Sequence, residues 1–140
     1  YRTAPSAMNK KEIRLFVFTE KGVYEYDAVA NSLTQKADGD HRELITGSAN
    51  GYKQAFAKEA PVTLLMVIDF NLIGTKNEQT IMMGCVDAGN VSENINLYCQ
   101  SVGLATVPRA THDTDGIRKL LALTDNQLPI MNNPVGWPKK

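Results

Sequence analysis

Few side chains in this sequence have the types and spacing needed to perform chemistry on their own. The two histidines, His41 and His112, lie far apart in polar surroundings, and we expect both at exposed loop or cap positions. The sequence contains no evident Ser/His/Asp set, no nucleophile elbow and no glycine-rich phosphate loop. Hydrolysis by protein groups alone is therefore not indicated.

The remaining candidates lie in one apolar stretch. Cys85 and Cys99 lack the spacing of zinc ligands, and the helical rise over the intervening residues would separate them by about 21 Å, beyond disulfide reach. We expect two buried, reduced thiols. Asp87 could be a functional acid, but a carboxylate satisfied by a helix cap or an interface partner is the favoured interpretation.

The composition is typical of a globular protein, and its net charge favours no particular class of binding partner. The 140 residues include 15 Lys and Arg and 15 Asp and Glu, which leaves a formal net charge of zero. This balance predicts neither nucleic acid nor membrane as a partner, and no run approaches the roughly 18 apolar residues of a membrane helix. The sequence opens with Tyr1 and not Met, so an upstream piece was removed or is absent, and a signal peptide could have been part of it.

The hydrophobic pattern predicts a mixed α+β chain, and its polar interruptions mark the ends of the elements. The strand over residues 62–69 is nearly continuous in apolar residues, which is typical of a strand buried on both faces. Strands are predicted over residues 13–19, 23–26, 32–36, 62–69 and 104–108, and an extended segment over 127–138. Helices are predicted over residues 41–46, 52–58, 78–102 and 113–122.

The helix over residues 78–102 is the longest element and is apolar over more than half of its circumference. Such a helix belongs in a core or in a subunit interface. Gly103 can end it, because glycine takes a positive φ at little cost. No repeat, linker or low-complexity tract interrupts the chain, so residues 1–140 are predicted to form one domain.

Without catalytic side chains, a cofactor is the expected source of chemistry. Residues 4–9 (Ala-Pro-Ser-Ala-Met-Asn) are similar to a Pro-Ser-x-x-Asn segment, and residues 134–138 (Pro-Val-Gly-Trp-Pro) to Val-Gly-Tyr-Pro, with Trp137 in place of Tyr. Residues 94–97 with 103–108 are similar to a central helix and the loop that follows it. Together these segments resemble the nitroreductase-like FMN-dependent oxidoreductases, most closely the SagB-type branch.

The resemblance implies a mainly antiparallel sheet flanked by helices, with a long central helix that packs against a second copy. It implies a homodimer with FMN at the subunit interface. Hydride would pass from NAD(P)H through the flavin, by a ping-pong route, to a small organic acceptor such as a nitroaromatic or a quinone. Because the flavin does the chemistry, no catalytic side chain and no metal are expected.

The resemblance also assigns the flavin-binding positions. Asn9 would reach the pyrimidine edge of the ring, while the backbone N–H groups of Ala110 and Thr111 would face N5 and O4. Lys11 stands where the family usually has Gln, as a cation near N1 and O2 or as a solvated lysine, and Arg109 is either a ring or phosphate contact or a surface arginine. The expected cofactor-binding set is Pro5, Ser6, Asn9, Lys11, Pro108, Arg109, Ala110, Thr111, Lys139 and Lys140.

This sequence departs from the family at its start. Family members carry an N-terminal segment with an Arg-Arg-Ser-x-Arg run that holds the FMN phosphate, and the sequence begins after that place. Lys139 and Lys140 could supply phosphate charge, although two lysines replace a bidentate fork poorly. A flavin-poor or non-enzymatic binding or structural domain of the same fold is therefore the alternative, and a ligand-binding α+β domain without redox function is a third. The compartment stays open between export to the periplasm and the cytoplasm.

Overall fold

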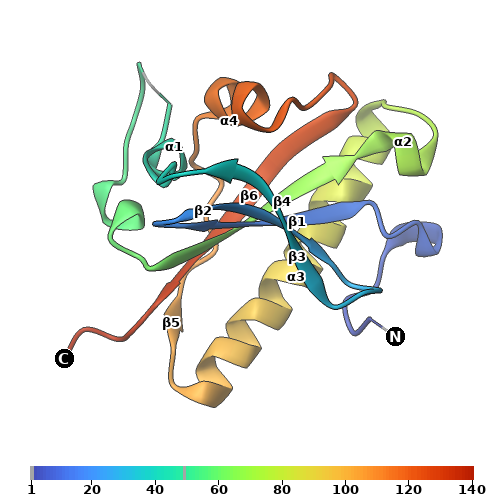
Figure 1. Ribbon diagram of the computed structural model, residues 1–140. Helices are drawn as coiled ribbons and strands as arrows, with labels where there is room; N and C mark the ends of the chain where they lie inside the picture. Colours follow the sequence, from blue (N-terminus) through green and yellow to red (C-terminus); the bar gives the residue numbers. More distant parts are fainter. Residues whose placement is uncertain (1, 49) are drawn as a thin grey trace.

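The computed structural model describes residues 2–48 and 50–140, and its centre is a six-stranded sheet (Figure 1). The strand order is β3-β2-β1-β4-β6-β5, and every neighbouring pair is antiparallel. The strands are β1 (Ile13–Thr19), β2 (Gly22–Asp27), β3 (Ser32–Asp38), β4 (Val62–Asp69), β5 (Ala105–Thr106) and β6 (Gln127–Gly136). The architecture is the predicted α+β class with a mainly antiparallel sheet.

Helices cover both faces of this sheet (Figure 1). They are α1 (Glu43–Thr46), α2 (Phe70–Ile73), α3 (Glu78–Val102) and α4 (Thr114–Leu121), with 3-10 turns η1 (Ala7–Asn9) and η2 (Ala55–Lys58). The predicted helix over residues 52–58 is only the η2 turn, and the predicted strand over 104–108 is reduced to two residues. Pro108 explains the second difference, because proline cannot donate to a strand ladder.

The main hydrophobic core lies between the sheet and the layer of α1, η2 and α4. Asp113 starts α4 as a side-chain cap, since its Oδ1 accepts the N–H of Gly116 at 3.0 Å. Alternation along β1 and β4 directs every second side chain into this core. Its fully buried members are Phe16, Phe18, Val23, Ile45, Ala57, Leu65, Val67 and Ile117.

The long helix α3 packs on the opposite face through small and polar side chains. Asn77 and Thr80 form a capping box at its start, and Gly103 ends it with φ of 77°, as predicted. The buried positions are Thr80, Gly84, Asp87, Ala88, Ser92 and Cys99. The large apolar residues Met82, Val86, Leu97, Tyr98 and Val102 are instead 49–64% exposed. The prediction of a core position is thus wrong for this outer face, and its role as an interface stays a prediction.

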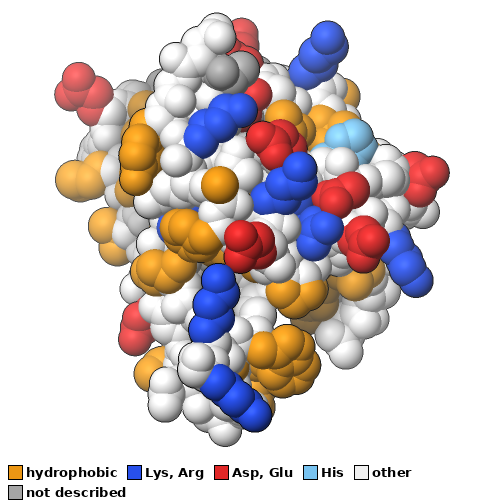
Figure 2. All heavy atoms as spheres, turned by 90° about the vertical axis from the view of Figure 1, so that its left-hand side faces the viewer, with side chains coloured by type: hydrophobic (Ala, Val, Ile, Leu, Met, Phe, Trp, Pro, Cys, Tyr) orange, Lys and Arg blue, Asp and Glu red, His pale blue; other side chains and the backbone are white. Residues whose placement is uncertain are grey.

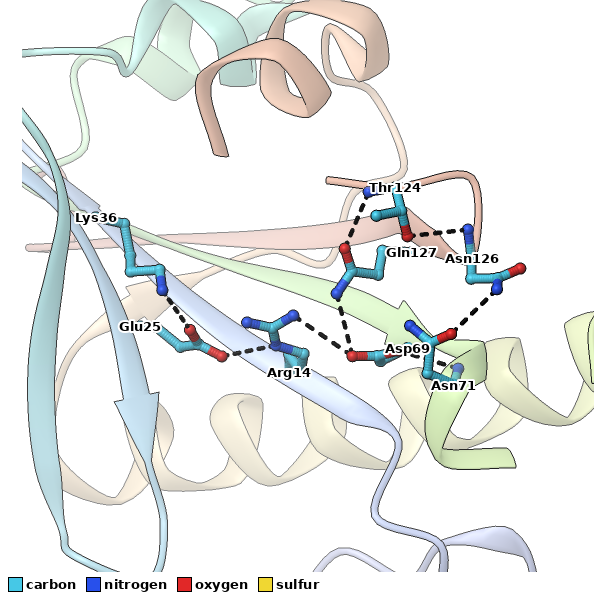
Figure 3. Close-up of polar contacts among 8 residues, drawn as sticks. All are labelled: Arg14, Glu25, Lys36, Asp69, Asn71, Thr124, Asn126 and Gln127. Atoms are coloured by element: carbon cyan, nitrogen blue, oxygen red, sulfur yellow. Dashed lines mark hydrogen bonds and ion pairs between the residues drawn. The ribbon is translucent and has the colours of Figure 1, made fainter. Parts of the chain in front are cut away.

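A row of polar contacts crosses five strands near one end of the sheet (Figure 3). Arg14 donates to Glu25 at 2.7 Å and to Asp69 at 3.4 Å, and Lys36 lies 3.3 Å from Glu25. On the other side, Gln127 donates to Asp69 at 3.2 Å. Because each side chain meets partners from neighbouring strands, this row supports the register of the sheet.

The contact between α3 and β4 yields a stability prediction. A Cβ at Gly84 would lie 2.7–3.0 Å from three side-chain atoms of Ile68, so a larger residue cannot fit without displacement. We expect Gly84→Val to lower the free energy of unfolding by about 2 kcal/mol, measured by urea denaturation. Combined with Ile68→Ala, which removes the opposing atoms, the loss should be smaller than the sum of the single losses. Strictly additive losses would contradict this contact.

Candidate functional site

The expected flavin-binding positions form three groups in the structure. The first group lies in the loop before β1, the second between β5 and α4, and the third in the tail after β6. In Figure 1 the first loop lies at the right, while β5 and the chain that follows it lie left of centre. One copy of the chain therefore keeps the first two groups apart.

The first group occupies a tight loop around η1. The Ser6 hydroxyl accepts the N–H of Lys11 at 2.9 Å, and the Ser6 carbonyl accepts the N–H of Asn9 at 3.0 Å. Met8, Asn9 and Lys11 have φ of 50°, 56° and 55°, a region that non-glycine residues seldom adopt. Pro5, Asn9 and Lys11 are exposed, and Ser6 is half-buried. Strained backbone of this kind clusters at ligand sites.

Asp87 of α3 fixes this loop to the body of the protein. Its Oδ2 accepts the N–H of Ala7 at 2.6 Å, and Asn94 of the same helix donates to the Thr3 hydroxyl at 2.8 Å. Asp87 is 5% exposed, so this bond is shielded from water. Asp87 is thus a satisfied carboxylate, but its partner is the backbone of this loop and not a cap of its own helix or a subunit interface.

Glu12, at the end of the loop, is a buried acid that sequence reasoning missed. It is fully buried, and within the described residues neither of its oxygens meets a hydrogen-bond donor. Burial, and next the neighbouring Asp87, raise the pKa of Glu12 from 4.5 to about 7. A protonated Glu12 can donate to Asp87, which relieves the repulsion between two buried carboxylates. A glutamate that follows two lysines gives no sequence signal of this environment.

The second group is anchored to β6. Arg109 and Asn132 exchange backbone hydrogen bonds, with N–H to O distances of 2.8 Å and 2.7 Å. Pro108 and Ala110 are exposed, and Thr111 is half-buried. Across residues 2–48 and 50–140, no acceptor within hydrogen-bond distance meets the N–H groups of Ala110 and Thr111. The segment thus presents two adjacent, free backbone donors.

Arg109 itself is 6% exposed, so the alternative of a surface arginine is wrong. Its guanidinium donates to Gln54 and to the Asn132 Oδ1, both at 2.7 Å. It also donates to the carbonyls of Ile45 at 3.0 Å and Thr46 at 3.3 Å. Burial lowers the pKa of Arg109. The side chain therefore acts inside the protein, where it ties α1 and the residue before η2 to the segment.

Two further predictions from sequence are wrong, those of an exposed His112 and of a buried Cys85. His112 is 9% exposed and lies between the segment and β6, with Nε2 3.3 Å from the Pro129 carbonyl. Burial lowers the pKa of His112. Cys85 is exposed, because it lies on the outer side of α3, whereas Cys99 is buried. His41 is half-buried, with Nε2 2.8 Å from the Asp38 carbonyl.

The third group, Lys139 and Lys140, lies in an exposed tail beside a shallow groove. Lys139 Nζ is 3.4 Å from a carboxylate oxygen of Glu59. The groove holds about 530 Å³, and its apolar lining includes Phe56 and Trp137. Figure 2 looks onto the left-hand side of the molecule in Figure 1, the side of this tail, and shows hydrophobic side chains gathered there with charged groups among them.

Within the described part of the chain, no cluster of His, Cys, Asp and Glu could hold a metal ion. None of its helices combines the length and the apolar character needed to cross a membrane.

Known proteins are similar to this chain in sequence and in fold. The "Putative nitroreductase MJ1384" of Methanocaldococcus jannaschii is 25% identical over 146 residues, which cover 97% of this chain and 70% of that protein. A crystal structure of a "putative nitroreductase" from Ralstonia eutropha JMP134 is 27% identical with a TM-score of 0.85, over 99% of this chain and 64% of that chain. This chain thus spans less than two thirds of the length of the Ralstonia protein.

A more distant structure shares the fold alone. One chain of the Escherichia coli microcin synthetase McbBCD complex with truncated pro-MccB17 has a TM-score of 0.81 at 16% identity, over 100% of this chain and 57% of that chain. A family model described as the Nitroreductase family matches residues 1–137. Because this match covers nearly the whole sequence, and the fold agrees with it, the chain belongs to the nitroreductase family.

Proposed function

We propose that this chain forms the flavin-holding part of an FMN-dependent oxidoreductase. One observation carries the proposal: the segment after Pro108 presents the free N–H groups of Ala110 and Thr111 from a backbone that β6 holds in place. Two adjacent donors suit the N5 and O4 acceptors of a flavin ring. Membership of the nitroreductase family, whose members are typically flavin-dependent oxidoreductases, supports this reading.

The residues of this chain would bind and orient the flavin. The exposed Asn9 carboxamide offers both a donor and an acceptor to the pyrimidine edge, and Lys11 adds a positive charge nearby. The tail lysines Lys139 and Lys140 would supply charge toward the phosphate. Bound FMN would supply hydride transfer from NAD(P)H to a small organic acceptor, such as a nitroaromatic or a quinone.

We infer that two copies are needed to complete this site. The Asn9 loop and the Ala110 segment lie on different sides of one copy (Figure 1), so we infer that the flavin meets the Asn9 loop of one copy and the Ala110 segment of the other. The exposed apolar face of α3 offers the surface for a second copy, because large apolar patches of this kind mark interfaces. A homodimer with flavin between its subunits satisfies both observations.

Flavin retention is the first test. We expect the purified chain mixed with FMN to keep the visible flavin absorbance through desalting. Asn9→Ala should weaken FMN binding roughly tenfold, because it removes the carboxamide contacts to the ring. Asn31→Ala is the matched control, since Asn31 is also an exposed asparagine at positive φ, in the β2–β3 turn. A chain that ignores FMN would favour the flavin-poor domain, and equal losses in both variants would contradict the assignment of Asn9.

The Glu12 and Asp87 pair predicts a pH dependence of stability. Glu12 has a native pKa of about 7 against an ordinary value of 4.5, so the folded state binds more protons between these values. The contribution of Glu12 to the free energy of unfolding should therefore fall by on the order of 3 kcal/mol as pH rises from about 4.5 to 7. His112 contributes in the opposite direction, because burial lowers its pKa. Urea denaturation at pH 5 and pH 7.5 measures the sum of the two, so a variant of Glu12 is needed to separate them.

Glu12→Gln is the decisive variant, because glutamine stays neutral and can still donate to Asp87. The difference in unfolding free energy between the variant and the natural chain should grow with pH in this window. Asp40 and Glu25 titrate below this window, since their arginine partners lower their pKa values. The contribution of His112 is present in both proteins and cancels in the difference. An unchanged pH dependence in Glu12→Gln would show that Glu12 does not titrate there.

The outer face of α3 predicts the oligomeric state. We expect a dimer by size-exclusion chromatography with light scattering, and Val86→Lys should shift it toward monomer, because it places a charge in the apolar contact. Val29→Lys is the control, since Val29 is 94% exposed and belongs to the β2–β3 turn and not to α3. A natural chain that stays monomeric at tens of micromolar would refute the two-copy site.

A further inference from the structure

Two consecutive asparagines in β6 are fully buried, an unusual feature for a strand at the centre of a sheet. Asn132 and Asn133 are both 0% exposed. Successive strand residues point to opposite faces, so the two carboxamides enter different environments. Each buried amide needs its own set of hydrogen-bond partners, and these partners show what each asparagine holds.

Asn132 contacts three of the four residues in the segment 109–112, which lies between β5 and α4. Its Oδ1 accepts from the Arg109 guanidinium at 2.7 Å. Its Nδ2 donates to the Thr111 carbonyl at 3.1 Å and lies 3.3 Å from His112 Nδ1. Its backbone N–H and carbonyl pair with Arg109. Among residues 109–112, Ala110 is the one without a hydrogen bond to Asn132.

These contacts hold the peptide plane before Ala110 and the peptide plane after Thr111. The Arg109 carbonyl accepts from the Asn132 N–H, and the N–H of Ala110 lies opposite this carbonyl in a trans peptide, so it points away from β6. The Thr111 carbonyl is held by the Asn132 side chain. The N–H of Thr111 belongs to the peptide plane between these two anchors, which limits its rotation.

Asn133 provides a natural comparison, because its contacts lie elsewhere. Its Oδ1 accepts from the Ser92 hydroxyl at 2.7 Å. Its Nδ2 donates to Asn96 Oδ1 at 3.1 Å and to the Thr106 hydroxyl at 3.2 Å. Asn133 therefore joins α3 and β5 to the sheet, and its side chain forms no hydrogen bond with residues 109–112.

We propose that Asn132 is a positioning residue of the flavin site: its backbone N–H sets the direction of the Ala110 N–H through the Arg109 carbonyl, and its carboxamide restricts the Thr111 N–H through the Thr111 carbonyl. The proposal rests on the proposed function, because it assigns those two donors to the flavin ring. A donor that is aligned before the ligand arrives needs no reorganisation on binding. Asn132 thus acts on the flavin through the backbone and without touching it.

The test compares Asn132→Ala with Asn133→Ala, two truncations of buried amides one residue apart. In the flavin-free protein, the NMR order parameter of the Thr111 amide should fall from about 0.85 toward 0.6 in Asn132→Ala only, whereas that of Ala110 should stay high because alanine keeps the backbone bond to Arg109. The Kd for FMN should rise roughly tenfold in the same variant. Its bound flavin should have a more negative midpoint potential, because the reduced ring loses aligned donors.

Asn132→Asp keeps the measurement decisive if truncation prevents folding. It preserves the size of the side chain and an acceptor for Arg109, but its carboxylate cannot donate to the Thr111 carbonyl. Equal effects in the Asn132 and Asn133 variants, or unchanged order parameters in both Asn132 variants, would overturn the positioning role while FMN still binds the natural chain. Failure of the natural chain to bind FMN would instead overturn the proposed function, and the flavin assignment of Asn132 with it.

Discussion

Arg109 and Asn132 exchange three hydrogen bonds inside the protein, two between backbones and one from the guanidinium to the side-chain oxygen. A buried guanidinium is costly unless acceptors surround it, and within the described residues none of its hydrogen-bond partners is a carboxylate. The carbonyls of Ile45 and Thr46 and the side chain of Gln54 supply the remaining acceptors. The need to satisfy this one cation therefore places α1 and the start of η2 against the sheet.

Strand β6, which carries Asn132, also organises the opposite face of the sheet, on which α3 lies. The two sides of α3 carry unusually different types of residue. Its inner side carries Gly84, Asp87, Ala88 and Ser92, which allow the helix to lie close to β4 and β6. Its outer side carries the large apolar residues, which a helix on a monomer surface normally turns inward. Helix α3 thus packs on the sheet through its short side chains, while its large apolar side chains form an exposed outer surface.

The local sequence pattern was enough to predict the helices and strands whose first and last residues are not changed by packing against other parts of the chain. Residues 13–19, 62–69 and 78–102 fold as predicted, because alternation, continuous apolar character and caps are all written within each segment. The strand at 104–108 could not be predicted at its true length, because only Ala105 and Thr106 meet partners on β6. Whether a polar side chain of the site is buried depends on residues that are far from it in the sequence. Arg109 meets a carbonyl 64 residues away, and no local signal marks that contact.

The loop before β1 shows how such distant contacts maintain a costly local structure. Positive φ is tolerable for Asn9, whereas at Met8 and Lys11 it costs on the order of 1–3 kcal/mol each. Asp87 holds this backbone by accepting the Ala7 N–H at 2.6 Å. That carboxylate lies beside the buried Glu12, and a proton on Glu12 removes the repulsion between them. The proton on Glu12 therefore stabilises the same contact that keeps Asn9 presented to solvent, which links the charge state of the interior to the shape of the loop.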